Sequence, residues 1–232
     1  MILLSLNGVA TDNYTSENNT PHPDHRHEPS MKPSLPGHPE FDVLKTLKTP
    51  RKIQDFLDTI PINKEKPVET CTSPLVTLQR NKAHCMEGAL VAALALWMHG
   101  QPPLILDLKS ARNDVDHLVA LFRKDGYWGG ITKTNHCVLR YREPIYRDVR
   151  ELAVSFFHEY FLDRGQKTLR SYSRPFDLRS WKDDWITAPH DLWHLQNAID
   201  DSPHYPLVTR RQIAGLRRAD EIERRAGKLR EW

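Results

Sequence analysis

One run of residues, 85–97 (CMEGALVAALALW), constrains this chain more than any other segment. Glu87 is its only charged residue, and apolar side chains would cover nearly the whole circumference of a helix formed by this run. A surface helix carries a single apolar stripe, whereas a helix that is apolar all round is buried. Gly100 and Pro102 follow as termination signals. The sequence therefore predicts a central buried helix around which the other elements pack.

Three segments after this helix have the composition of β-strands. They are residues 104–108, 117–122 and 127–141. Asp125-Gly126 lies between the second and the third, and this dipeptide favours a tight hairpin turn. We therefore predict an antiparallel sheet that packs against the buried helix.

Four further segments have the periodicity of helices. They are residues 50–60, 149–161, 192–199 and a segment that opens at residue 209. Thr49 before Pro50 is an N-cap and first-turn pair. Thr209 followed three residues later by Gln212 is a capping box. Helices, then strands, then helices indicate an α+β fold.

Composition divides the chain into three parts. Residues 1–40 hold 6 of the 17 prolines and 4 of the 12 histidines, so we expect a disordered leader. Residues 41–208 form the predicted α+β domain. Residues 209–232 contain 8 Lys and Arg against 4 Asp and Glu, which flank an apolar seam. This last part is predicted to be a basic amphipathic helix.

The overall charge and the missing motifs exclude several classes of partner. The net charge of +3 gives no reason to expect nucleic acid, and the basic tail lacks interleaved aromatic residues. The longest uncharged apolar run, residues 89–98, is half of the about 20 residues that a membrane span needs. No G-x-G-x-x-G or P-loop motif is present, so we expect no nucleotide and no other cofactor.

The cysteines bear on the compartment and on the chemistry. There are 3, without C-x-x-C spacing, which indicates free thiols in a reducing, cytoplasmic compartment. Cys85 would begin the buried helix, where free N–H groups and the helix dipole stabilise a thiolate. A thiolate nucleophile needs a base, and His117, at the start of a predicted strand, is the candidate. Each residue alone is more often structural, so the prediction depends on their combination.

The order of these residues resembles the catalytic core of the transglutaminase-like superfamily, whose plan is similar to that of papain. The resemblance is carried by Cys85 at the start of a buried helix, His117 at the start of a strand, and the Gly-x-Trp turn at residues 126–128. It covers residues 79–141, about a quarter of the chain, and the flanks resemble a bacterial transglutaminase-like family. The resemblance implies a papain/transglutaminase-like core with Cys85 as nucleophile, His117 as base and Gln79 as oxyanion-hole donor.

The third catalytic role departs from the superfamily pattern. Thr132 occupies the position where the superfamily has an Asp, and Asn135 follows three residues later. Papain-like proteases use an Asn to orient the imidazole, so Asn135 is the preferred candidate and Thr132 the second. Asp116 adjoins His117, but neighbouring residues in a strand point to opposite faces of the sheet. We therefore do not expect Asp116 to orient the histidine.

This set of residues predicts acyl transfer on an amide or peptide bond of a protein or peptide substrate. The thiolate would form a thioester, and water or an amine would resolve it, with hydrolysis as the expected outcome. Two hypotheses stay open: a cysteine-dependent amide hydrolase, protease or acyltransferase, and a non-catalytic protein-binding module that keeps the fold but lacks the third residue.

Histidines in two other places have metal-ligand spacing. His190 and His194 are four residues apart, with His204 beyond them, but the glutamate of an H-E-x-x-H motif is absent. His22, His25 and His27 lie close together in the proline-rich leader. A short helix with surface histidines and a flexible leader explain both groups, so we predict no metal site.

Overall fold

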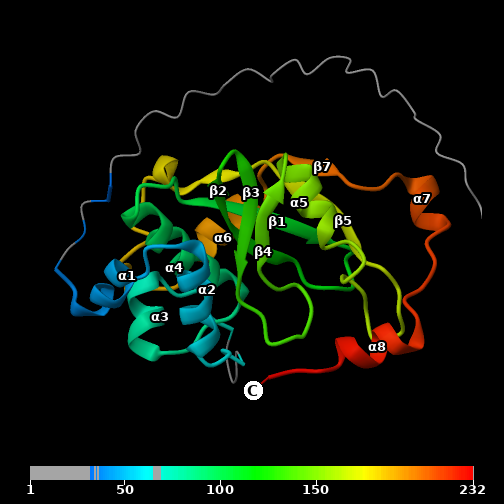
Figure 1. Ribbon diagram of the computed structural model, residues 1–232, viewed down its shortest axis with the longest axis horizontal. Helices are drawn as coiled ribbons and strands as arrows, with labels where there is room; N and C mark the ends of the chain where they lie inside the picture. The colour runs from blue at the N-terminus through cyan, green and yellow to red at the C-terminus, as the bar shows by residue number, and fades with distance from the viewer. Residues whose placement is uncertain (1–31, 34, 36, 65–68, 232) are drawn as a thin grey trace, which may run out of the picture.

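The computed structural model describes residues 32–33, 35, 37–64 and 69–231 (Figure 1). The predicted leader lies mostly outside these residues, and so do His22, His25 and His27. The described part contains eight α-helices and a seven-stranded antiparallel sheet. The predicted α+β class is therefore confirmed.

The sheet has the strand order β4-β3-β2-β1-β5-β7, and β6 also pairs with β1. The strands are β1 (Leu104–Ser110), β2 (His117–Lys124), β3 (Tyr127–Thr132), β4 (Arg142–Tyr146), β5 (Leu169–Ser173), β6 (Phe176–Asp177) and β7 (His204–Pro206). All of the pairings are antiparallel. Four strands, β4, β5, β6 and β7, were not predicted from the sequence, and each has no more than five residues.

The hairpin between β2 and β3 forms at the predicted position. Lys124 pairs with Tyr127, and the two residues between them, Asp125 and Gly126, have φ values of 52° and 87°. A two-residue turn with positive φ at both positions matches the twist of the flanking strands, and Asp-Gly tolerates it.

The prediction of a strand over residues 127–141 is wrong in its second half. β3 ends at Thr132, and residues 133–141 form a loop before β4 begins. The loop is held by the C-terminal segment instead of a neighbouring strand: the Cys137 amide donates to the Leu229 carbonyl at 3.2 Å, and the Glu231 amide donates to the Asn135 carbonyl at 2.8 Å. Pro144, which lies inside β4, is tolerated because β4 is at the edge of the sheet.

The helices are α1 (Asp42–Thr46), α2 (Pro50–Thr59), α3 (Pro74–Arg80), α4 (Cys85–Met98), α5 (Val149–Ser155), α6 (Trp193–Asp200), α7 (Arg210–Ala214) and α8 (Glu221–Gly227). Five helices, α2, α4, α5, α6 and α7, begin within one residue of their predicted starts, and the predicted end of α5 is far off; α1 and α3 were not predicted. The predicted Thr49 cap and the Thr209–Gln212 capping box are both present. α5 ends six residues before the predicted Phe161, because the chain turns back there and Phe161 pairs with Lys167. The basic tail forms two short helices, α7 and α8, instead of one.

The core lies on both faces of the sheet. On one face, Leu118 and Ala120 of β2 pack in the cluster that contains α4, whose residues from Met86 to Leu96 are all buried. On the other face, Val119 and Leu121 of the same strand pack against α5. Figure 1 shows α1 to α4 gathered on one side of the sheet and α5 on the other. The buried central helix is therefore confirmed, and strand alternation separates the two clusters.

Gly88 lets α4 approach the chain after β3. A Cβ atom at this position would lie 2.3 Å from the Lys133 Cβ. Lys133 cannot move aside easily, because its ammonium donates to the carbonyls of Leu57, at 2.8 Å, and Ile60. We expect Gly88→Ala to lower the free energy of unfolding by about 1–3 kcal/mol, the usual cost of overpacking. Urea unfolding measures this, with Gly37→Ala as the control because nothing lies within 4 Å of its Cβ position; equal stability of the two variants would contradict the prediction.

Candidate active site

Cys85 is the first residue of α4, and its side chain is partly exposed. The residue before it, His84, is the N-cap, and its Nε2 donates to the Thr70 carbonyl at 2.7 Å. The first N–H groups of a helix have no partners within the helix, so they and the helix dipole favour negative charge at this end. The thiol therefore lies where an anion is stabilised.

Glu87 fixes the start of α4 from inside the protein. Its carboxylate is 1% exposed and accepts hydrogen bonds from five donors. These are the Asn63 side-chain amide at 3.1 Å, the Thr70 hydroxyl at 2.8 Å, the Thr72 backbone amide and hydroxyl at 3.2 and 2.9 Å, and the His84 backbone amide at 3.1 Å. Burial alone would raise the pKa of Glu87, but the charge of His84 and these hydrogen bonds hold it below the usual value.

His117 is buried and is the first residue of β2, where its backbone pairs with Leu108 of β1. This register brings its ring to the start of α4. Burial would raise the pKa of the Cys85 thiol, but hydrogen bonds with His117 and His84 and the charges of both imidazoles outweigh it and lower that pKa to about 5. Burial lowers the pKa of His84, but the hydrogen bond and charge of Cys85 and the charge of Glu87 raise it to about 9. The site thus favours a thiolate beside an imidazolium.

Two cavities meet at Cys85 and His84. The larger has a volume of about 550 Å³, and its lining includes His117, Asn135 and Tyr160. The smaller has a volume of about 430 Å³, and its lining includes Trp193 and several carboxylates. Both volumes are in the range of small-molecule and peptide sites. The thiol is therefore reachable from two sides.

The structure brings some of the predicted residues together and separates others. Asn135 lines the larger cavity with Cys85 and His117, because the C-terminal segment holds its loop there. Thr132 is buried in β3 opposite Val119, its backbone is bound by the Gln54 side chain, and it lines neither cavity.

His117 has no orienting partner among the described residues, and Gln79 lies away from the two cavities. The Nε2 atom of His117 is buried and has no hydrogen-bond partner among the described residues. Gln79 lies at the far end of α3, where its amide donates to Glu40 at 2.9 Å, and it lines neither cavity. The backbone N–H groups at the start of α4 are better placed to hold an oxyanion than Gln79 is, since they adjoin the thiol.

The sequence pointed neither to His84 nor to the place of Asp116 in both cavities. The signal for His84 was a residue with a side-chain acceptor three positions before Glu87, which is the spacing of a capping box. Asp116 lines both cavities and accepts from the Ser110 amide at 2.6 Å. It precedes the first residue of β2, so strand alternation does not fix its direction.

The histidines with metal-ligand spacing are not gathered in one place. His190 and His194 stack with ring centroids 6.3 Å apart, and His194 faces Asp183 at 3.3 Å. His204 lies elsewhere, with its Nε2 3.1 Å from Asp107.

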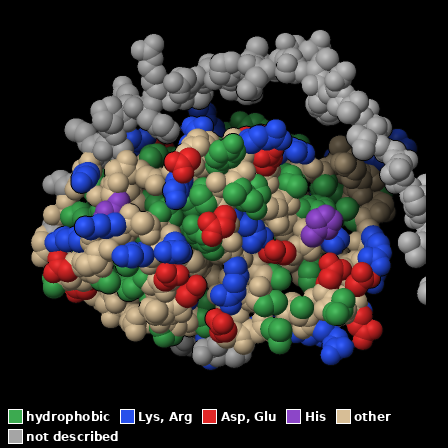
Figure 2. Space-filling view, in the orientation of Figure 1, with side chains coloured by type: hydrophobic (Ala, Val, Ile, Leu, Met, Phe, Trp, Pro, Cys, Tyr) green, Lys and Arg blue, Asp and Glu red, His purple; other side chains and the backbone are tan. Residues whose placement is uncertain are grey.

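The surface and the comparisons add little to this site. Figure 2 shows basic and acidic side chains interspersed over the face that it presents. Among the residues that the structure describes, none of the helices has the length and apolar character needed to span a membrane. No protein-family model and no curated protein matches the sequence.

Proposed function

We propose that this protein is a transglutaminase-like cysteine enzyme that hydrolyses or transfers the acyl group of an amide or peptide bond. The observation that carries the proposal is the Cys85 thiol at the start of a buried helix, with two imidazoles that lower its pKa to about 5. Lowered thiol pKa values beside a histidine are typical of catalytic cysteines. The three cysteines are free, which supports the expected reducing, cytoplasmic compartment.

The reaction follows from these groups. The Cys85 thiolate attacks the carbonyl carbon, and the N–H groups at the start of α4 stabilise the oxyanion. The C–N bond breaks as the imidazolium of His117 gives its proton to the leaving amine, which leaves a thioester on Cys85. Neutral His117 then takes a proton from water, the hydroxide adds to the thioester, and the carboxylic acid leaves as the thiolate is restored. An amine in place of water would give transfer instead of hydrolysis.

Asn135 is the preferred group to orient His117, because Thr132 lines neither cavity. Asn135 lines the same cavity as the thiol and the imidazole, and the unpartnered Nε2 of His117 is the atom that such a group would bind. Catalytic hydrogen bonds often tighten only in the complex, so this contact would form when substrate binds.

The test is turnover of glutamine-containing peptides, assayed as ammonia or new amino termini released, and as incorporation of a primary amine. We expect Cys85→Ala to abolish turnover and His117→Ala to reduce kcat by about 100-fold to 10,000-fold, the usual contribution of a general base. Asn135→Ala should reduce kcat less. Cys137→Ala is the matched control, because this exposed thiol lines neither cavity. Turnover that survives in Cys85→Ala would overturn the proposal.

The alternative is a non-catalytic module that binds a protein or peptide in the same cavities. The unpartnered Nε2 of His117 favours it, because an unoriented base is a poor catalyst. Under this alternative, Cys85→Ala would bind a captured peptide as tightly as the wild-type protein does, and no thioester would form in either.

A further inference from the structure

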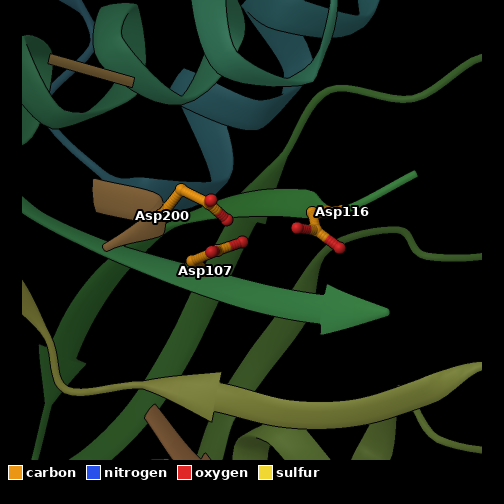
Figure 3. Close-up of side chains that lie close together, drawn as sticks. All are labelled: Asp107, Asp116 and Asp200. Carbon is orange, nitrogen blue, oxygen red and sulfur yellow. The ribbon is translucent and has the colours of Figure 1, made fainter. Parts of the chain in front are cut away.

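Three aspartates from separate parts of the chain meet in the smaller cavity (Figure 3). Asp107 belongs to β1, Asp116 immediately precedes β2, and Asp200 is the last residue of α6. One carboxylate oxygen of each lies within 4.8 Å of those of the other two. Figure 3 shows the carboxylate of Asp107 lying between those of Asp200 and Asp116. Three negative groups at this separation repel one another unless positive charge lies among them.

Asp107 is the member that most needs a partner. It is 2% exposed, and its Oδ1 is buried without a hydrogen-bond partner among the described residues. Its other oxygen is held by His204 Nε2 at 3.1 Å, which fixes the direction of the carboxylate. A buried carboxylate oxygen without a partner is costly.

The contacts of the other two aspartates leave room for a ligand. Asp116 accepts from the Ser110 amide through Oδ1. Asp200 binds the Lys109 ammonium through Oδ1 at 2.6 Å, and this ion pair offsets one of the three negative charges. Each of these two residues has a second oxygen that these contacts do not use.

We propose that Asp107, Asp116 and Asp200 bind one Ca²⁺ ion. Carboxylate oxygens are the ligands of hard cations, and one oxygen of each aspartate lies within 4.8 Å of the others, close enough for all three to contact one ion. Mg²⁺ demands a near-ideal octahedron and usually binds through one or two carboxylates and several waters, whereas Ca²⁺ takes more protein oxygens in a flexible geometry. Water in the cavity of about 430 Å³ completes the coordination. His204 acts as an outer partner that orients Asp107. This site is independent of the proposed enzymatic function, although Cys85 lines the same cavity.

Luminescence of Tb³⁺, which occupies Ca²⁺ sites, tests the proposal on the full chain. Trp193 lines the cavity, so its excitation should sensitise bound Tb³⁺. We expect saturable emission that Ca²⁺ displaces and that Mg²⁺ displaces at least about 10-fold less well. Asp200→Asn should weaken Tb³⁺ binding by at least about 10-fold, since loss even of an outer partner costs that much. Asp125→Asn is the matched control, because it makes the same charge change in the exposed hairpin turn.

A second measurement separates binding from loss of folding and from loss of the sensitiser. Saturating Ca²⁺ should raise the Tm of the wild-type protein and of Trp193→Phe by about 4 °C or more, and should raise that of Asp200→Asn clearly less. Asp200 is half-exposed, so this variant should fold. No saturable Tb³⁺ emission, equal binding by Asp200→Asn and wild type, or displacement by Mg²⁺ as effective as by Ca²⁺ would overturn the proposal.

Discussion

At pH 6, iodoacetamide should alkylate Cys85 at least about 1,000-fold faster than Cys71. With a pKa of about 5, about nine-tenths of Cys85 is thiolate at this pH. Burial and the charge of Glu87 raise the pKa of Cys71 to about 12, so only about one molecule in a million is ionised there. A less basic thiolate is a weaker nucleophile, and this reduces the expected ratio of the two rates from about a million to about a thousand. Peptide mass spectrometry against time measures both rates in one sample.

The pH dependence of the Cys85 alkylation rate distinguishes the effect of the two imidazoles on the thiol pKa from the effect of the helix N-terminus. The rate at Cys85 should rise with a midpoint near pH 5 in the wild-type protein. His117→Ala removes a hydrogen bond and a positive charge from the thiolate, so its midpoint should move upward towards the ordinary thiol value of about 8.5. His84→Gln should move it in the same direction, and the double variant should move it furthest. A wild-type midpoint near 8.5 would mean that no thiolate–imidazolium pair exists, and the enzymatic proposal would fail with it.

Replacement of Glu87 by Ala should lower the free energy of unfolding by about 3–5 kcal/mol, the cost of breaking a buried charged network by removing one partner. The substitution leaves the five donors that bind this carboxylate without an acceptor in the interior. It also removes the group that fixes His84 next to the thiol. Equilibrium unfolding in urea measures the loss, and the alkylation profile of the variant measures its effect on Cys85.

Glu223→Ala is the matched control for this variant. Glu223 has the same place in a capping box, at the start of α8, and its carboxylate accepts from the Asp220 amide at 2.6 Å. α8 has no buried residues, so water can replace the lost bond there. The loss of stability should therefore be clearly smaller than at Glu87. Equal losses in the two variants would show that Glu87 acts as an ordinary helix cap, and that its burial adds nothing.

The elements that the sequence predicted well are those whose signals are local. The apolar run at residues 85–97 became the buried helix α4, and Asp125-Gly126 became the hairpin turn. The cap at Thr49 formed because a hydroxyl next to a proline satisfies a nearby N–H whatever packs around it. The pairing of Cys85 with His117 was anticipated from a resemblance as well as from position, and their proximity depends on the β1–β2 register.

The predictions that failed concern contacts between distant segments. The loop at residues 133–141 has strand-like composition, yet the C-terminal segment takes its backbone hydrogen bonds. Gln79 was assigned through the resemblance to papain-like enzymes, but it lies in the last turn of α3, where its side chain binds Glu40. The three aspartates are up to 93 residues apart, so no spacing rule could group them.

The sequence by itself determined that this chain has a buried helix with a cysteine at its start, a tight hairpin and an α+β class, because side-chain periodicity, turn residues and caps act within a few positions. Only the tertiary structure decided which groups surround that cysteine. The imidazoles of His84 and His117, the loop of Asn135 and the carboxylates of the smaller cavity come from different elements. Sheet register and helix packing bring them together, and both depend on burying apolar surface across the whole fold.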